Sequence, residues 1–200
     1  MARTMKRLIL TSGALLLMTQ LAHAHTGVGQ ASGFMHGFSH PFSGLDHILA
    51  MVAVGLFAAQ RGGRALWLVP LTFVAMMAVG GALGVYGVAL PMVELGIAAS
   101  VIVLGAAVAM QANLPVAAAM GLVGFFAIFH GHAHGAEMPV DASGFIYAAG
   151  FMIATAILHA VGVGLGVAIG TLAQGRFDRA VRVAGGAMSL AGVGILTGVL

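Results

Sequence analysis

Six apolar stretches separated by short connections constrain the fold of this chain more than any other feature. They cover roughly residues 45–60, 65–86, 91–111, 114–129, 144–173 and 180–200. Each is close to the ~20 residues with which a helix crosses a ~30 Å hydrocarbon core. A hydrophobic content of 60% and a mean hydropathy of +1.07 exclude an ordinary soluble domain. The sequence therefore predicts an all-α, polytopic membrane protein with six transmembrane helices in one bundle.

The first 24 residues have the pattern of a secretory signal peptide. Three basic residues precede an apolar run that begins at Leu8, and Ala22-His23-Ala24 is a small-residue cleavage pattern. An uncleaved first helix is the alternative, but the apolar run, about 14 residues, is short for a span. We therefore expect residues 1–24 to be removed and residues 25–200 to form a single six-helix transmembrane domain.

The arginines predict the orientation of the helices. Cleavage would leave five basic and five acidic residues, so the pI of about 10.2 does not indicate nucleic-acid binding. With the new N-terminus in the periplasm, the connections after the first, third and fifth spans are cytoplasmic. Two of these connections hold every remaining arginine, namely Arg61, Arg64, Arg176, Arg179 and Arg182. This distribution agrees with the positive-inside rule.

Glycines at four-residue spacing recur in the spans, as at Gly80 and Gly84 or at Gly162 and Gly166. Helix backbones approach closely where Cβ atoms are missing, and this contact supports helix association in lipid. We therefore expect the helices to form one compact bundle.

Most histidines and acidic residues fall on the predicted outer side, and the first cluster runs from His40 to His47. The chain has no cysteine, so a metal ion would bind through nitrogen, carboxylate or thioether. If Pro41 breaks the helix and a turn brings His40 back toward Asp46 and His47, the three side chains suit a borderline divalent ion. The alternative is a capping box of Ser43 and Asp46 at the start of the span, which does not explain the histidines.

The second cluster is the sequence FHGHAHGAE, which follows the fourth span. In a continued helix, His130, His134 and Glu137 would share one face because they are spaced i, i+4 and i+7. His132 would point about 200° away from His130. The two glycines weaken helix propensity, so the alternative is a solvated His-rich loop at the membrane surface. Three imidazoles and a carboxylate nevertheless match the ligand types of a divalent metal.

Three further polar residues are candidates for function. His36 lies on the outer side before the first cluster, and we include it among the candidate metal ligands. Glu94 either complements the N-terminal dipole of its helix or acts as a ligand. His159 lies some 15 residues into the fifth span, where an ionisable group is a functional candidate by default, although it could also be a neutral, hydrogen-bonded histidine.

At the two clusters the sequence resembles the HupE/UreJ family of nickel permeases, which accompany hydrogenase and urease maturation. The likeness rests on His40-x5-Asp46-His47 and on Phe129-His130-Gly131-x-Ala133-His134-Gly135-x-Glu137. It implies inward transport of Ni²⁺ across a bacterial inner membrane and leaves nickel and cobalt open as cargo. The positions that it marks as functional are His40, Asp46, His47, His130, His134 and Glu137. It also adds weight to Glu94 and none to His132.

Under this interpretation the clusters form an outer metal-binding site and no cofactor is permanently bound. Only neutral imidazole binds metal, so uptake should weaken below an external pH of about 6. No P-loop motif occurs in the chain, so we expect no ATPase activity and favour a facilitator over an ion-coupled transporter. Two alternatives stay open: a multi-pass zinc-dependent hydrolase with the same ligand types, and a b-type cytochrome with paired histidines.

Overall fold

The computed structural model describes residues 30–138, 143–172 and 177–200, and it contains no β-strand in these ranges. The elements are α2 (Gln30–Ser39), η2 (His40–Phe42), α3 (Leu45–Arg61), α4 (Ala65–Val85), α5 (Val93–Ala109), α6 (Val116–Ala136), α7 (Gly144–Leu172) and α8 (Phe177–Leu196). The predicted all-α class is therefore confirmed for these residues. The predicted signal peptide lies outside them.

Each of the six apolar segments predicted from the sequence contains a helix. Four helices are long and apolar enough to cross a membrane, namely α4, α6, α7 and α8. The segments Gly33–Phe42 and Leu45–Arg61 meet at an angle of 77° and together qualify as one bent or re-entrant span. Helix α5 is apolar but has only 17 residues. Length and composition thus support a multi-pass membrane protein with four or five spans, and the count of six stays a prediction.

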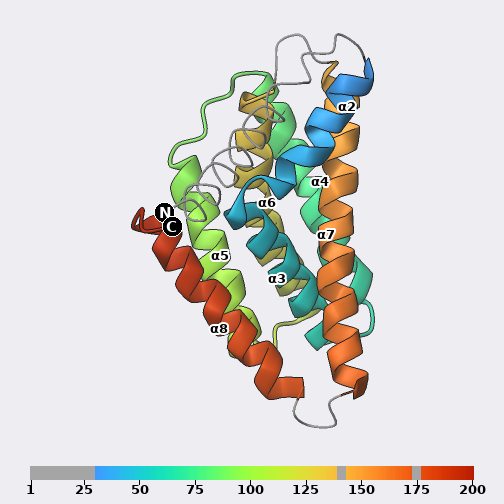
Figure 1. Ribbon diagram of the computed structural model, residues 1–200, viewed down its shortest axis with the longest axis vertical. Coiled ribbons are helices and arrows are strands. Elements are labelled where there is room, and N and C mark those ends of the chain that lie inside the picture. The colour runs from blue at the N-terminus through green and yellow to red at the C-terminus, as the bar shows by residue number, and fades with distance from the viewer. Residues whose placement is uncertain (1–29, 139–142, 173–176) are drawn as a thin grey trace, which may run out of the picture.

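Helix α3 lies in the middle of the bundle and contacts α4, α5, α7 and α8 (Figure 1). Its side chains Met51, Val54 and Phe57 have no exposed surface. The remaining helices pair around it: α4 with α6, α5 with α8, and α2 along one part of α7. This arrangement places the start of α3 and α5 at the same end of the bundle as the end of α6.

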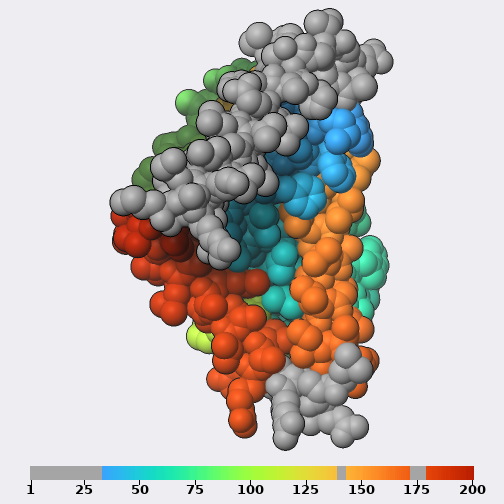
Figure 2. Space-filling view, viewed as in Figure 1, coloured from blue at the N-terminus to red at the C-terminus, as the bar shows by residue number. Residues whose placement is uncertain are grey.

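The outer surface of the bundle is strongly apolar. Figure 2 shows α7 and α8 along one face. Their exposed side chains include Ile153, Ile157, Val161, Leu165, Leu190 and Val193. Because a soluble protein rarely exposes a continuous apolar patch of this extent, the surface supports contact with lipid.

Helix α6 continues to Ala136, beyond the predicted end of the fourth span at residue 129. The reason is tertiary packing, which overrides the low helix propensity of glycine. A Cβ atom on Gly131 would overlap the backbone carbonyl of Met77, and one on Gly84 would overlap that of His132. The predicted close approach at Gly80 and Gly84 is therefore confirmed between α4 and α6, and it holds the histidine-rich sequence in a helix.

Candidate metal centre

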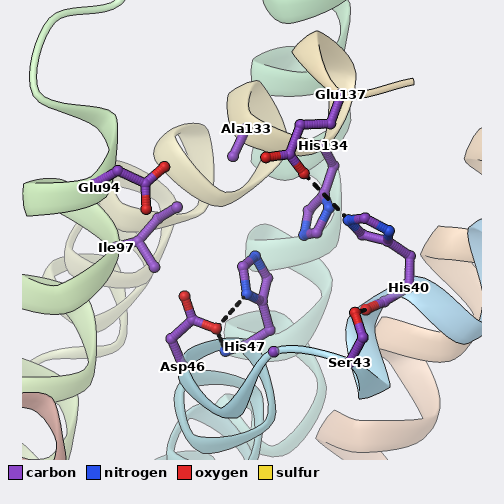
Figure 3. A pocket seen from close by; sticks show the side chains of 10 residues that line it. His40, Ser43, Asp46, His47, Glu94, Ile97, Ala133, His134 and Glu137 are labelled. Carbon is purple, nitrogen blue, oxygen red and sulfur yellow. Dashed lines mark hydrogen bonds and ion pairs between the residues drawn. The ribbon is translucent and has the colours of Figure 1, made fainter. Parts of the chain in front are cut away.

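A pocket at one end of the bundle contains most of the ligands predicted from the sequence (Figure 3). Four elements form it: η2, the first turns of α3 and α5, and the last turn of α6. Its lining residues are His40, Ser43, Gly44, Asp46, His47, Glu94, Ile97, Ala133, His134 and Glu137. The two sequence clusters, about ninety positions apart, thus face each other across one cavity.

The outermost group in this pocket consists of His40, His134 and Glu137. One possible ligand atom from each residue lies within 4.8 Å of the others. His40 Nε2 is 3.4 Å from Glu137 Oε2, and the rings of His40 and His134 are 4.7 Å apart. Burial increases from exposed Glu137 through His40 to His134, which is 4% exposed. Two imidazoles and a carboxylate are ligand types that borderline divalent transition metals accept.

His40 enters the pocket because the chain bends before α3. Helix α2 ends at Ser39, and Pro41 lies in the first turn of the short helix η2. The predicted turn at Pro41 is therefore confirmed. The alternative of a capping box is wrong for Ser43, whose Oγ donates to His40 O at 2.6 Å, and the N-cap of α3 is Gly44 without a side-chain cap. Asp46 does accept a backbone N–H in the first turn of the helix, as that alternative expects.

Asp46 and His47 form a tight pair in the first turn of α3. Asp46 Oδ1 accepts the backbone N–H of His47 at 2.8 Å and lies 2.7 Å from His47 Nδ1. A carboxylate oxygen carries no proton at neutral pH, so Nδ1 donates, and in the neutral imidazole the lone pair is on Nε2. His47 Nε2 is buried and has no hydrogen-bond partner in the described part of the chain. This carboxylate–histidine arrangement is the one that orients imidazole ligands in many metal sites.

Two histidines lie deeper in the bundle than the pocket. His130 is fully buried; its ring is 4.7 Å from that of His47, and its Nε2 is 2.7 Å from Ser100 Oγ. His159 on α7 is 1% exposed, and its ring is 5.0 Å from Phe73, which also lies 5.7 Å from His130. Neither ring nitrogen of His159 has a partner among the residues that the structure places.

The other predicted residues have distinct positions. Glu94 is exposed in the first turn of α5 and also lines the pocket, so both of its predicted roles are compatible with its place. His36 is exposed on α2, with its ring 6.4 Å from that of His40, and does not line the pocket. Its role as a ligand stays a prediction. His132 does not line the pocket, and its Nε2 is 2.7 Å from Val88 O.

Two residues near the imidazoles, Ser100 and Tyr147, were not predicted from the sequence. Ser100 is fully buried against His130, and Tyr147 is 3% exposed with its ring 6.3 Å from that of His40. A signal existed for Ser100: it is the only hydroxyl residue in the apolar sequence of α5. An isolated polar residue in a span usually faces the interior of a bundle. Nothing in the sequence distinguished Tyr147 from the other aromatic residues of the spans.

Comparison with known proteins identifies the family of the chain. The model of the family described as HupE / UreJ protein matches residues 13–195. Protein HupE of Rhizobium leguminosarum bv. viciae is 50% identical over 191 residues, which cover 95% of this chain and 97% of that protein. No solved structure matches the chain. The chain therefore belongs to the HupE/UreJ family, a family of transport and accessory proteins and not of enzymes.

Proposed function

We propose that this protein is a permease that imports Ni²⁺, with Co²⁺ as the second candidate cargo, across the bacterial inner membrane for hydrogenase or urease maturation. The observation that carries the proposal is the convergence of His40, His134 and Glu137 at an open pocket that leads to buried imidazoles. Family membership supports a transport or accessory role and argues against the alternative of a zinc-dependent hydrolase.

The arginines support a periplasmic position for the pocket. Arg61 ends α3 and donates to Asn113 Oδ1, and Arg182 Nε near the start of α8 donates to Ala109 O at 3.0 Å. Both contacts lie at the opposite end of α3 and α5 from the pocket. Because basic residues favour the cytoplasmic side, the pocket faces outward in this orientation.

In this function the pocket exchanges part of the hydration shell of the ion for protein ligands. Exposed Glu137 and Glu94 attract the cation, and His40 and His134 supply neutral nitrogen donors. A permease must release what it captures, so a small ligand set completed by water suits transport better than a closed structural site. Affinity alone does not select nickel, because copper ranks above it in the Irving–Williams order. Selectivity then depends on geometry and on which ions are available.

Uptake of radioactive nickel by cells that lack their own nickel importers tests this proposal. We expect the wild type to raise uptake, and His134→Ala and Glu137→Gln to abolish most of the increase at equal membrane levels. His132→Ala is the matched control, since this histidine lies in the same turn of α6 but contacts Val88 O outside the pocket. The proposal fails if the wild type imports neither nickel nor cobalt, or if His132→Ala is as damaging as His134→Ala.

A further inference from the structure

Three imidazoles lie close together beneath the mouth of the pocket. The ring of His47 is 4.3 Å from that of His134 and 4.7 Å from that of His130. All three residues are buried, with exposed fractions of 8% for His47, 4% for His134 and 0% for His130. Each ring has at least one buried nitrogen without a partner in the described ranges. Buried polar atoms normally have a partner, so this group needs a physical explanation.

Ser100 determines which nitrogen of His130 carries the proton. Ser100 Oγ is 2.6 Å from Ile97 O and 2.7 Å from His130 Nε2. A carbonyl oxygen has no proton, so the contact with Ile97 uses the single hydroxyl proton of Ser100. The Ser100 oxygen can then only accept from His130, which places the proton on Nε2. The lone pair of His130 is therefore on Nδ1, the nitrogen without a partner.

The same logic applies to His47, where Asp46 Oδ1 accepts the hydrogen bond from Nδ1–H and the lone pair of the neutral ring is on Nε2. Two neighbouring histidines thus have an acceptor that fixes the tautomer and a second nitrogen that is free to bind. Metal-binding histidines show this division of roles: one nitrogen binds the ion and the other donates to a carboxylate, carbonyl or similar acceptor.

We propose that Ser100 is a positioning residue that presents the Nδ1 lone pair of His130 to the transported ion. His130 and two other histidines of the family motifs, His47 and His134, then act as an inner, all-imidazole station that the ion reaches after the mouth. This inference rests on the proposed function and extends it inward from the mouth. Imidazole ligands select borderline transition dications over Mg²⁺ and Ca²⁺, which prefer oxygen. His134 belongs to both groups, so the ion keeps one ligand while it exchanges His40 and Glu137 for His47 and His130.

Nickel uptake kinetics test the role of Ser100. We expect Ser100→Ala to lower the maximal rate about 10- to 100-fold, the usual effect of removing a residue that orients a metal ligand. The half-saturating nickel concentration should stay near that of the wild type, because the mouth is intact. Ser100→Thr keeps the hydroxyl and should restore the rate. Ser189→Ala is the matched control, since Ser189 Oγ donates to Ile102 O of the same helix α5 and has no hydrogen bond to an imidazole of the residues that the structure describes.

A tautomer measurement on the purified full chain in detergent gives a readout that does not depend on transport. In protein labelled with ¹⁵N-histidine, two-bond ¹H–¹⁵N correlations distinguish the two neutral tautomers, and His130→Gln identifies the signals of His130. We expect the Nε2–H form in the metal-free wild type and a shift toward the Nδ1–H form in Ser100→Ala. Paramagnetic Ni²⁺ should broaden the signals of His47, His130 and His134 together.

The two experiments separate the failure of this inference from the failure of the proposed function. A wild type that imports no nickel overturns the permease, whereas the tautomer and the nickel broadening still decide on the inner station. The inference is overturned if His130 is the Nδ1–H form in the wild type, if Ni²⁺ broadens His134 without His130, or if Ser100→Ala transports like Ser189→Ala.

Discussion

Gly131→Ala should destabilise the bundle because it adds a Cβ atom at the contact between α6 and α4. That atom would lie 2.8 Å from the backbone nitrogen of Gly81 and would overlap the carbonyl oxygen of Met77. Both obstacles are backbone atoms, so no side-chain rotation relieves the overlap and the two helices must separate. Inserting one carbon into a well-packed interior typically costs about 1–3 kcal/mol.

Gly121→Ala on the same helix provides the reference for this effect. A Cβ atom on Gly121 meets nothing within 4 Å. In both variants alanine raises helix propensity by about 1 kcal/mol, so the difference between the two unfolding free energies isolates the overlap. We expect Gly131→Ala to be about 1–3 kcal/mol less stable than Gly121→Ala, which is roughly a factor of 5 to 150 in the unfolding equilibrium.

Reversible unfolding of the purified protein in mixed micelles, with increasing mole fraction of sodium dodecyl sulfate, measures this difference. Within each variant, far-ultraviolet circular dichroism and tryptophan fluorescence should report the same unfolding transition. The chain has a single tryptophan, Trp67 on α4. Gly131→Ala should also reduce nickel uptake, because it shifts the neighbouring His130. Equal stability of the two variants would refute the argument that α4 and α6 are held at this close distance.

Three further predictions concern the site and its orientation. Nickel uptake should fall at acidic external pH, because protonation removes the lone pair with which imidazole binds the metal; a rate that rises toward pH 5 would contradict nitrogen ligation. Asp46→Asn should lower uptake about 10- to 100-fold, since an amide holds the Nδ1 proton of His47 less strongly than a carboxylate, and Asp46→Glu should recover part of the rate. In the cysteine-free chain, Ala89→Cys beside the pocket end should react with a membrane-impermeant maleimide in spheroplasts, whereas Asn113→Cys at the arginine end should react only after lysis.

Much of the helical plan could be predicted from the sequence, because hydropathy responds directly to what a span requires. The connections after α3 and α5 and the bend at Pro41 lie close to their predicted positions. The end of α6 differed for a physical reason: glycine lowers local helix propensity, and only contact with α4 shows that Gly131 and Gly135 are needed there. The short length of α5 also shows that an apolar stretch is not always a complete helix of the same length.

For the site, the sequence indicated which residue types could bind a metal but not how they divide the task. The spacing of His130, His134 and Glu137 predicted a common face, and the pocket brings His134 and Glu137 to His40. Local spacing gives no information on contacts between helices, so Ser100 could not be paired with His130. The sequence predicted Asp46 as a ligand, and this stays a prediction; its 2.7 Å contact with His47 adds an orienting interaction that the sequence did not show.

The order of the ligands gives the proposed path a direction. The mouth offers the carboxylates of Glu94 and Glu137, whereas the inner group offers imidazole nitrogens, because the contact of Asp46 with His47 occupies its Oδ1. A dication is therefore attracted most strongly at the mouth of the pocket, where it still keeps part of its hydration shell. It binds less tightly after it has left the carboxylates of the mouth. Transport requires capture followed by release, so a ligand set that loses negative charge inward favours the second step without a closed, high-affinity site. Replacing His130 by Asp reverses this order, and we expect that variant to bind nickel more tightly in detergent while transporting it more slowly in cells.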